Sequence, residues 1–195
     1  MSEVLEDFKQ YLPTYLSGTA KDNLFKELES FPKNIDERIY TRKLQGEAVV
    51  FQGDGIKEMP FINLPNEKVG PANVLVISNT CDIDPTNQRE IPLQVSYCPI
   101  VKLGSWLSRL REPAPLDQAV RAQRVSSMFY LPKNEHLKDD SVALLDRMVS
   151  CSPKTLPFEN LREKKLFTLS DYGFYLFLFK LSIHMTRIRE GVART

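Results

Sequence analysis

Hydrophobic side chains are most concentrated in residues 74–78, where the chain reads V-L-V-I-S. The run is short, continuous and rich in β-branched residues, which is typical of a strand that is buried on both faces. It ends in the polar run N-T-C-D-I-D of residues 79–84, and Pro85 follows directly. The pattern predicts a central strand that carries a thiol, an amide and two carboxylates to its end, where functional sites often form.

Apolar and polar residues alternate on both sides of this stretch, which predicts further antiparallel strands. The G-D-G of residues 53–55 is typical of a turn. The segment M-P-F-I-N-L-P, residues 59–65, contains two prolines and therefore predicts an edge or a loop. The predicted strands are residues 39–44, 47–52, 74–78, 91–101, 128–132 and 141–145.

The first part of the chain has apolar residues at helical spacing. Residues 2–11 and 20–29 are the predicted helices, and a proline follows each of them within three residues. We therefore expect residues 1–37 to form an N-terminal helical extension.

The remaining residues, 38–195, are expected to form one domain. It contains a helical insertion near residues 104–127, where the strand pattern is interrupted. It ends in a long helix over residues 170–189, for which Ser170 is the expected N-cap.

Composition narrows the class of protein. The 195 residues include 42% hydrophobic and 26% charged side chains, so a packed core is expected and global disorder is not. The net charge of +1 shows no global basic excess of the kind that marks many nucleic-acid-binding proteins. Three widely spaced cysteines without a C-x-x-C motif favour a reducing compartment over a disulfide scaffold or a zinc knuckle. The charged start and the short apolar stretch 174–183 fit neither a signal peptide nor a membrane span, so we expect a cytoplasmic protein without membrane contact.

Several blocks of sequence follow one another in a familiar order. They are residues 46–51, then V-G-P-A-N-V-L-V-I-S-N, then L-Q-V-S-Y-C-P-I-V, then D-S-V-A-L-L-D-R-M-V, with a terminal helix after them. In this order the chain resembles the PemK/MazF family of bacterial toxins, over residues 46–103 and 139–187.

The resemblance implies a fold, an activity and partners. Family members form a small SH3-like antiparallel β-barrel with a C-terminal helix, so the expected fold class is α+β. They cut single-stranded RNA and usually pair as homodimers. The implied partners are therefore single-stranded RNA or another nucleic acid, an antitoxin or other protein, and a second copy of the chain.

Two positions depart from the family pattern. The family's catalytic arginine precedes the V-L-V-I-S strand, where this chain has Ala72 and Asn73. The family's catalytic threonine or serine ends a P-I-T strand, where this chain has Val101. Because the arginine stabilises charge on the phosphate and the hydroxyl relays a proton, these changes predict loss of the usual cleavage. Arg121 or Arg124 of the insertion would restore it only by moving into that site.

The polar run after the central strand carries the candidate chemistry. Cys81 is a nucleophile only if a base lies near it, and the alternative is a structural cysteine. Asp82 and Asp84 face the same way in an extended chain and suit Mg²⁺, whereas the alternative is a solvated turn in which Asn79 and Asp82 bond their own backbone. We assign no catalytic residue, no metal and no cofactor from the sequence.

Arginines are the candidates for contact with phosphate groups. Two lie in the insertion, and Arg187, Arg189 and Arg194 lie near the chain end, where a helix terminus favours cations in any case. The predicted substrate-binding residues are Asn79, Thr80, Cys81, Asp82, Asp84, Arg121 and Arg124.

Three functions remain open at this point. The first is a nucleic-acid-directed protein of toxin–antitoxin or phage-defence type that lacks the usual catalytic residues; if it is an enzyme, it is endoribonuclease-like or another phosphodiester hydrolase. The second is a non-catalytic protein-interaction module of the same fold. The third is a metal-dependent hydrolase that uses residues 79–84. The first predicts a concave basic surface that meets these residues, and the second predicts an apolar, uncharged groove there.

Overall fold

The computed structural model describes residues 19, 26, 30–31, 35–44, 46–87, 90–91 and 93–186. Apart from residue 26, the helices predicted for the N-terminal extension lie outside these residues. The arginines near the chain end also lie outside them. No helix in the described part of the chain is long and apolar enough to cross a membrane.

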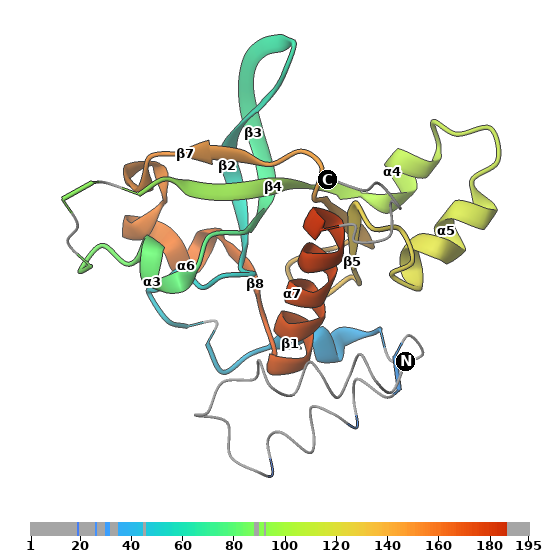
Figure 1. Cartoon of the computed structure of the whole chain (residues 1–195), viewed down its shortest axis with the longest axis horizontal. Helices are drawn as coiled ribbons and strands as arrows, with labels where there is room; N and C mark the ends of the chain where they lie inside the picture. Colours follow the sequence, from blue (N-terminus) through green and yellow to red (C-terminus); the bar gives the residue numbers. More distant parts are fainter. Residues whose placement is uncertain are drawn as a thin grey trace, which may run out of the picture.

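The described residues form an α+β structure with one antiparallel sheet (Figure 1). The first elements in chain order are η1 (Glu37–Ile39), β1 (Tyr40–Thr41), β2 (Gly55–Asn63), β3 (Asn66–Val76), α3 (Thr80–Ile83), β4 (Val95–Lys102), α4 (Leu103–Leu107) and α5 (Ala114–Arg121). They are followed by β5 (Met128–Leu131), β6 (Ser141–Leu144), β7 (Val149–Cys151), η2 (Pro153–Thr155), η3 (Phe158–Asn160), α6 (Leu161–Lys164), β8 (Lys165–Leu169) and α7 (Asp171–Thr186).

The strand order is β1-β8-β2-β3-β4-β6-β5, and β7 pairs with β4 beside β6. All the pairings among the described strands are antiparallel, which confirms that part of the prediction. The sheet stays open, because β1 and β5 lie at opposite ends of the strand order. The closed SH3-like barrel is therefore not confirmed.

The predicted central strand lies in the middle of the sheet. Val74, Leu75 and Val76 of β3 are almost completely buried and pair with β4. Leu75 belongs to one apolar cluster, whereas Val74 and Val76 belong to another. The continuous apolar run thus marks a strand that is covered on both faces, as its composition predicts.

Helix α7 covers one face of the sheet (Figure 1). Its Phe177 ring lies 5.6 Å from the ring of Phe129 in β5, within a cluster that also contains Leu75. Ser170 is the N-cap, since its Oγ accepts a hydrogen bond from the backbone N–H of Gly173. A Cβ at Gly173 would lie 2.1 Å from the carbonyl oxygen of Ile39, so the glycine permits the helix to pack closely on η1.

The opposite face of the sheet has two separate apolar covers. Near one end of the sheet, Ile83 of α3 and Leu161 of α6 pack against Val74. At the other end, Leu103 and Val120 from α4 and α5 pack over β5 and β6. The predicted insertion is therefore a pair of short helices that covers one end of this face.

One strand prediction is wrong, because residues 47–52 contain no strand. M-P-F-I-N, predicted as an edge or a loop, lies within the long strand β2. Strands β7 and β8 were not predicted. Pro60 and Pro71 face each other in the β2–β3 hairpin, beyond the residues that pair with β8 and β4. Each proline therefore lies where its strand has a free edge and needs no backbone donor on that side.

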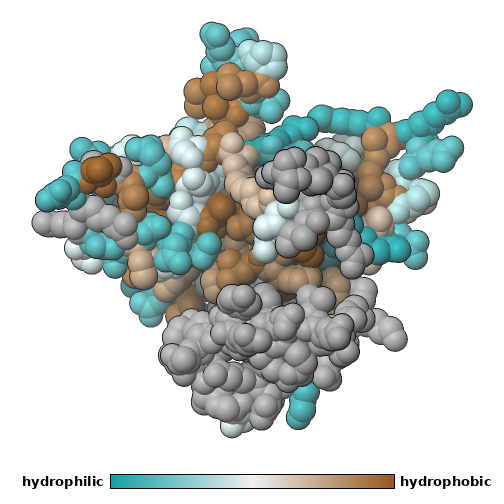
Figure 2. All heavy atoms as spheres, in the orientation of Figure 1, coloured by the Kyte–Doolittle hydropathy of each residue, from teal (hydrophilic) through white to brown (hydrophobic). Residues whose placement is uncertain are grey.

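The end of the β2–β3 hairpin projects from the rest of the molecule (Figures 1 and 2). Leu64 and Val69 are largely exposed on it, and Figure 2 shows apolar atoms along its length. The hairpin follows from strand length, because β2 and β3 extend past the last residues of their neighbours.

A fully buried ion pair joins two segments that are far apart in the sequence. Lys165 Nζ lies 2.9 Å from Asp54 Oδ2, and neither side chain is exposed to solvent. Lys165 also donates a hydrogen bond to the carbonyl of Val49, and Asp54 Oδ2 accepts one from the N–H of Phe51. Burial raises the pKa of Asp54, and the charge of Lys165 opposes this rise. The pair fastens residues 49–54 to β8.

We expect Asp54→Asn and Lys165→Met each to lower the free energy of unfolding by about 3–5 kcal/mol, since each leaves a buried group without its partner. The double variant should lose less than the sum of the two single losses. Urea unfolding measures all three values. The control is Lys102→Met at the exposed Lys102–Asp139 pair, where the loss should stay below about 1 kcal/mol. Similar losses at the buried and the exposed pair would contradict this prediction.

Candidate functional site

The polar run after the central strand forms a capped turn. Helix α3 begins after Asn79, whose Oδ1 accepts a hydrogen bond of 2.9 Å from the N–H of Cys81. Asp84 Oδ1 accepts hydrogen bonds from the N–H and the hydroxyl of Thr86. These contacts hold the pKa of Asp84 below its usual value. For Asn79 the capped-turn alternative is confirmed, while the substrate-binding role of these residues stays a prediction.

Residues 49–54 hold this turn in position through hydrogen bonds. The N–H of Gln52 donates to Thr80 Oγ1 at 3.0 Å, and its side-chain amide donates to the carbonyl of Ile77. Asn87 closes the turn by donating to the carbonyl of Cys81. Ile83 anchors α3 in the core, whereas Cys81 is exposed. The turn is thus rigidly placed, with one thiol at its surface.

The described residues around this turn give little support to a catalytic or metal-binding role. No group of three metal-ligating side chains occurs among the described residues. Asp54, the carboxylate in the preceding turn, is already engaged by Lys165. His136 lines a separate hollow beside Tyr40, and His184 lies on α7. The cysteine and metal hypotheses therefore gain no support from the described part of the chain.

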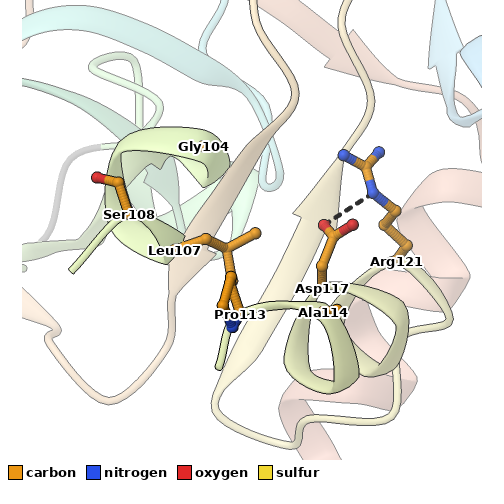
Figure 3. A pocket seen from close by; sticks show the side chains of 7 residues that line it. All are labelled: Gly104, Leu107, Ser108, Pro113, Ala114, Asp117 and Arg121. Carbon is orange, nitrogen blue, oxygen red and sulfur yellow. Dashed lines mark hydrogen bonds and ion pairs between the residues drawn. The ribbon is translucent and has the colours of Figure 1, made fainter. Parts of the chain in front are cut away.

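A groove lies between the two helices of the insertion. Gly104, Leu107 and Ser108 of the α4 segment line one wall, and Pro113, Ala114, Asp117 and Arg121 of the α5 segment line the other. Figure 3 shows Leu107 reaching from α4 towards Pro113 at the start of α5. We call this cavity of about 370 Å³ the α4–α5 groove.

Arg121, at the end of the groove, is bound by three side chains. Its Nε donates to Asp117 Oδ1 at 2.9 Å, as Figure 3 shows. Its Nη1 donates to Asp140 Oδ2 at 2.6 Å and to the hydroxyl of Tyr130 at 2.9 Å. Two carboxylates thus surround one guanidinium, so the local charge is negative and does not favour a phosphate group.

The titration of the neighbouring groups reflects the same contacts. Burial alone would raise the pKa of Asp140, but hydrogen bonds from Arg121 and from the N–H of Lys133 hold it below its usual value. Burial and the charge of Asp140 raise the pKa of Tyr130 to about 12. Asp140 therefore stays ionised and Tyr130 neutral near pH 7, which suits a structural clamp between α5 and the sheet.

The structure separates the two halves of the predicted substrate site. Ser78, just before α3, accepts a hydrogen bond from the N–H of Ser96 at the start of β4. At the other end of β4, Lys102 pairs with Ser141. The residue before Ser141 is Asp140, which binds Arg121. Along β4 these ends are about 20 Å apart. Figure 1 accordingly shows α3 and α5 at opposite sides of the molecule.

The two positions that depart from the family pattern lie on neighbouring strands. Asn73 pairs with Ile100, so that Ala72 and Val101 follow on β3 and β4. Ala72 packs against the apolar cluster under α6, and Val101 packs against the cluster under α4 and α5. Neither side chain offers a charge or a hydroxyl. These two positions therefore do not restore the RNA cleavage that the sequence predicts to be lost.

Sequence reasoning missed two buried cations. Lys165 lies in β8, which the alternation of residues did not reveal. Lys180 lies within the apolar α7, where a single lysine among aromatic residues was the available signal. Lys180 Nζ donates to the carbonyl of Gln123, whose own side chain bonds the N–H and the carbonyl of Tyr130. Lys180 thus links α7 to the end of the insertion.

We expect Arg121→Met to lower the free energy of unfolding by about 1–2 kcal/mol, because it leaves Asp117, Asp140 and Tyr130 without their shared donor. The half-exposed position of the side chain keeps the loss moderate. Arg124→Met is the control at an exposed arginine and should change stability by less than about 0.5 kcal/mol. Urea unfolding distinguishes the two, and equal effects would argue against the clamp.

We also expect Lys180 to make stability depend on alkaline pH. Burial lowers the pKa of Lys180 to about 8, whereas the unfolded chain keeps the usual value of 10.5. Between these values the unfolded state binds more protons, so the stability of the protein rises with pH relative to Lys180→Met. The full change is about 3 kcal/mol. Urea unfolding from pH 7 to 10.5 measures it, and the control Lys154→Met should follow wild type throughout; a flat difference for Lys180→Met would refute the prediction.

Comparison with known proteins adds no family to these observations. No protein-family model matches the chain, and no curated protein matches it.

Proposed function

We propose that the protein is a non-catalytic protein-interaction module with a PemK/MazF-like fold, which binds its partner at the α4–α5 groove. The observation that carries the proposal is this groove, which lies at the insertion and not at residues 79–84, where the sequence predicted it. Leu107, Pro113 and Ala114 line it, and its one lining cation, Arg121, is already bound by two carboxylates. Concave apolar surfaces of this kind are typical of sites that bind other molecules.

The positions where catalysis would be expected support this proposal. Ala72 and Val101 replace the arginine and the hydroxyl that the resemblance implies, and the described residues around α3 offer no base or metal cluster. Removing a single charge-stabilising donor commonly costs about 10²–10³-fold in rate, and here both groups differ. Arg121 does not take the place of the missing arginine, because its guanidinium is already held by Asp117, Asp140 and Tyr130.

A nucleic-acid-directed function is the second candidate. Arg109, Arg111 and Arg124 are exposed and form no ion pair with the described residues, so they are free to contact phosphate groups. The toxin–antitoxin or phage-defence role and the homodimer that the resemblance implies belong to this candidate. It requires binding of single-stranded RNA that depends on these arginines.

We expect the purified protein not to cleave single-stranded RNA. The test incubates it with a mixture of labelled RNA oligonucleotides, with and without Mg²⁺, and resolves the products on a gel. Wild type, Arg124→Ala and Asp82→Ala should give the same uncleaved pattern, because none of them holds an assembled catalytic site.

Two outcomes would replace the proposal. Cleavage without metal that Arg124→Ala abolishes would establish a rebuilt ribonuclease site in the insertion. Cleavage that needs Mg²⁺ and is lost in Asp82→Ala would establish the metal-dependent hydrolase at residues 79–84.

A further inference from the structure

We infer that the partner of the α4–α5 groove is an acidic amphipathic helix of another protein. The inference rests on the proposed function and identifies the class of its partner. It follows from the charge of the insertion, from the lining of the groove and from the way the two helices are held.

The charge of the insertion differs from that of the rest of the chain. The insertion, residues 104–127, contains four basic and two acidic side chains, which gives a net charge of +2, whereas the whole chain carries +1. The remainder of the chain is therefore net negative. The exposed arginines at the rim of the groove attract an acidic partner and steer its approach, whereas the clamp around Arg121 within the groove is net negative.

The free positive charges lie at both ends of the groove. Arg109 and Arg111 are exposed in the turn between α4 and α5, and Arg124 is exposed just after α5. None of the three forms an ion pair with the described residues, in contrast to Arg121. Figure 2 shows hydrophilic side chains extending from this part of the surface, with an apolar patch between them. Carboxylates of a bound helix can therefore pair with guanidinium groups that the chain itself leaves unused.

The lining between these charges is partly apolar, and Ser108, Asp117 and Arg121 complete it. Leu107, Pro113 and Ala114 offer no hydrogen-bonding side chain, and Leu110 in the same turn is partly exposed. An amphipathic helix can place one apolar face in such a groove and leave its charged face at the rim. A nucleic acid fits less well, because no aromatic residue lines the groove for stacking of bases.

The two helices that form the groove are attached firmly to the sheet. Leu103, Leu107 and Val120 are buried in the cluster over β5 and β6, and Arg121 connects α5 to Asp140. Because such a site is formed before binding, little free energy is needed to order the protein when the partner binds. The groove is therefore suited to receive a helix without rearrangement.

The test selects peptides from a displayed library of random 16-residue sequences against the full-length protein. We expect the enriched peptides to carry an excess of Asp and Glu and to repeat apolar residues at i, i+3, i+4 and i+7. A synthetic copy of the most enriched peptide is then titrated by fluorescence anisotropy. The absence of enrichment, or enrichment of peptides without this charge and period, would overturn the inference.

Variants locate the binding. The double variant Arg109→Glu/Arg111→Glu should weaken binding of the peptide at least 10-fold, because it reverses the charge at the rim. Ala114→Trp should weaken binding as much by filling the groove. Arg162→Glu on α6, at the other end of the sheet, is the matched control and should bind as wild type does. The urea midpoint of each variant verifies that it is folded. Binding that is insensitive to both groove variants would place the peptide elsewhere and overturn the inference.

A 20-nucleotide single-stranded RNA serves as the competing probe in the same titration. If the RNA alone binds, and Arg109→Glu/Arg111→Glu abolishes this, the nucleic-acid candidate replaces the helix. Cleavage products in the separate gel assay would instead disprove the proposed non-catalytic function. Failure of the inference about the partner and failure of the proposed function therefore give different results.

Discussion

The ion pair between Asp54 and Lys165 is the interaction on which the arrangement of the described residues depends. Both charges are removed from water, which costs several kcal/mol for each ion unless the two remain paired and hydrogen-bonded. The pair fastens residues 49–54 to β8, and Gln52 in that segment then holds Thr80 at the start of α3. The position of the turn after β3 therefore depends on the Asp54–Lys165 contact with β8, which lies on the other side of β2.

Arginines of the insertion serve two different purposes, although they are close in sequence. Arg121 is enclosed by Asp117, Asp140 and Tyr130, so its charge is used within the protein to attach α5 to the sheet. Arg109 and Arg124 remain exposed, and their charge is available for another molecule. A firm attachment at one arginine and free charge at others suit the preformed groove that we propose as a binding site.

Much of the fold could be predicted, because its signals are local. The continuous apolar run predicted β3, and alternation predicted β4. Two apolar segments joined by a polar loop predicted the β5–β6 pair, and Ser170 predicted the start of α7. The errors lie where a neighbouring strand decides the outcome. M-P-F-I-N forms a strand because its one proline, Pro60, lies where β2 has a free edge. K-L-F-T-L was missed as β8 because all five residues are buried and show no alternation.

For the candidate site, the sequence by itself determined the capped turn, because Asn79 and Asp84 bond backbone groups only two residues away. It also determined that the insertion is helical and rich in arginine. Only the tertiary structure decided which arginine is free, since Asp140 reaches Arg121 through strand pairing rather than through sequence proximity. The tertiary structure likewise separated the turn from the arginines, because the length of β4 lies between them. Local hydrogen bonds can be predicted from adjacent residues, whereas contacts between distant segments depend on how the whole sheet is assembled.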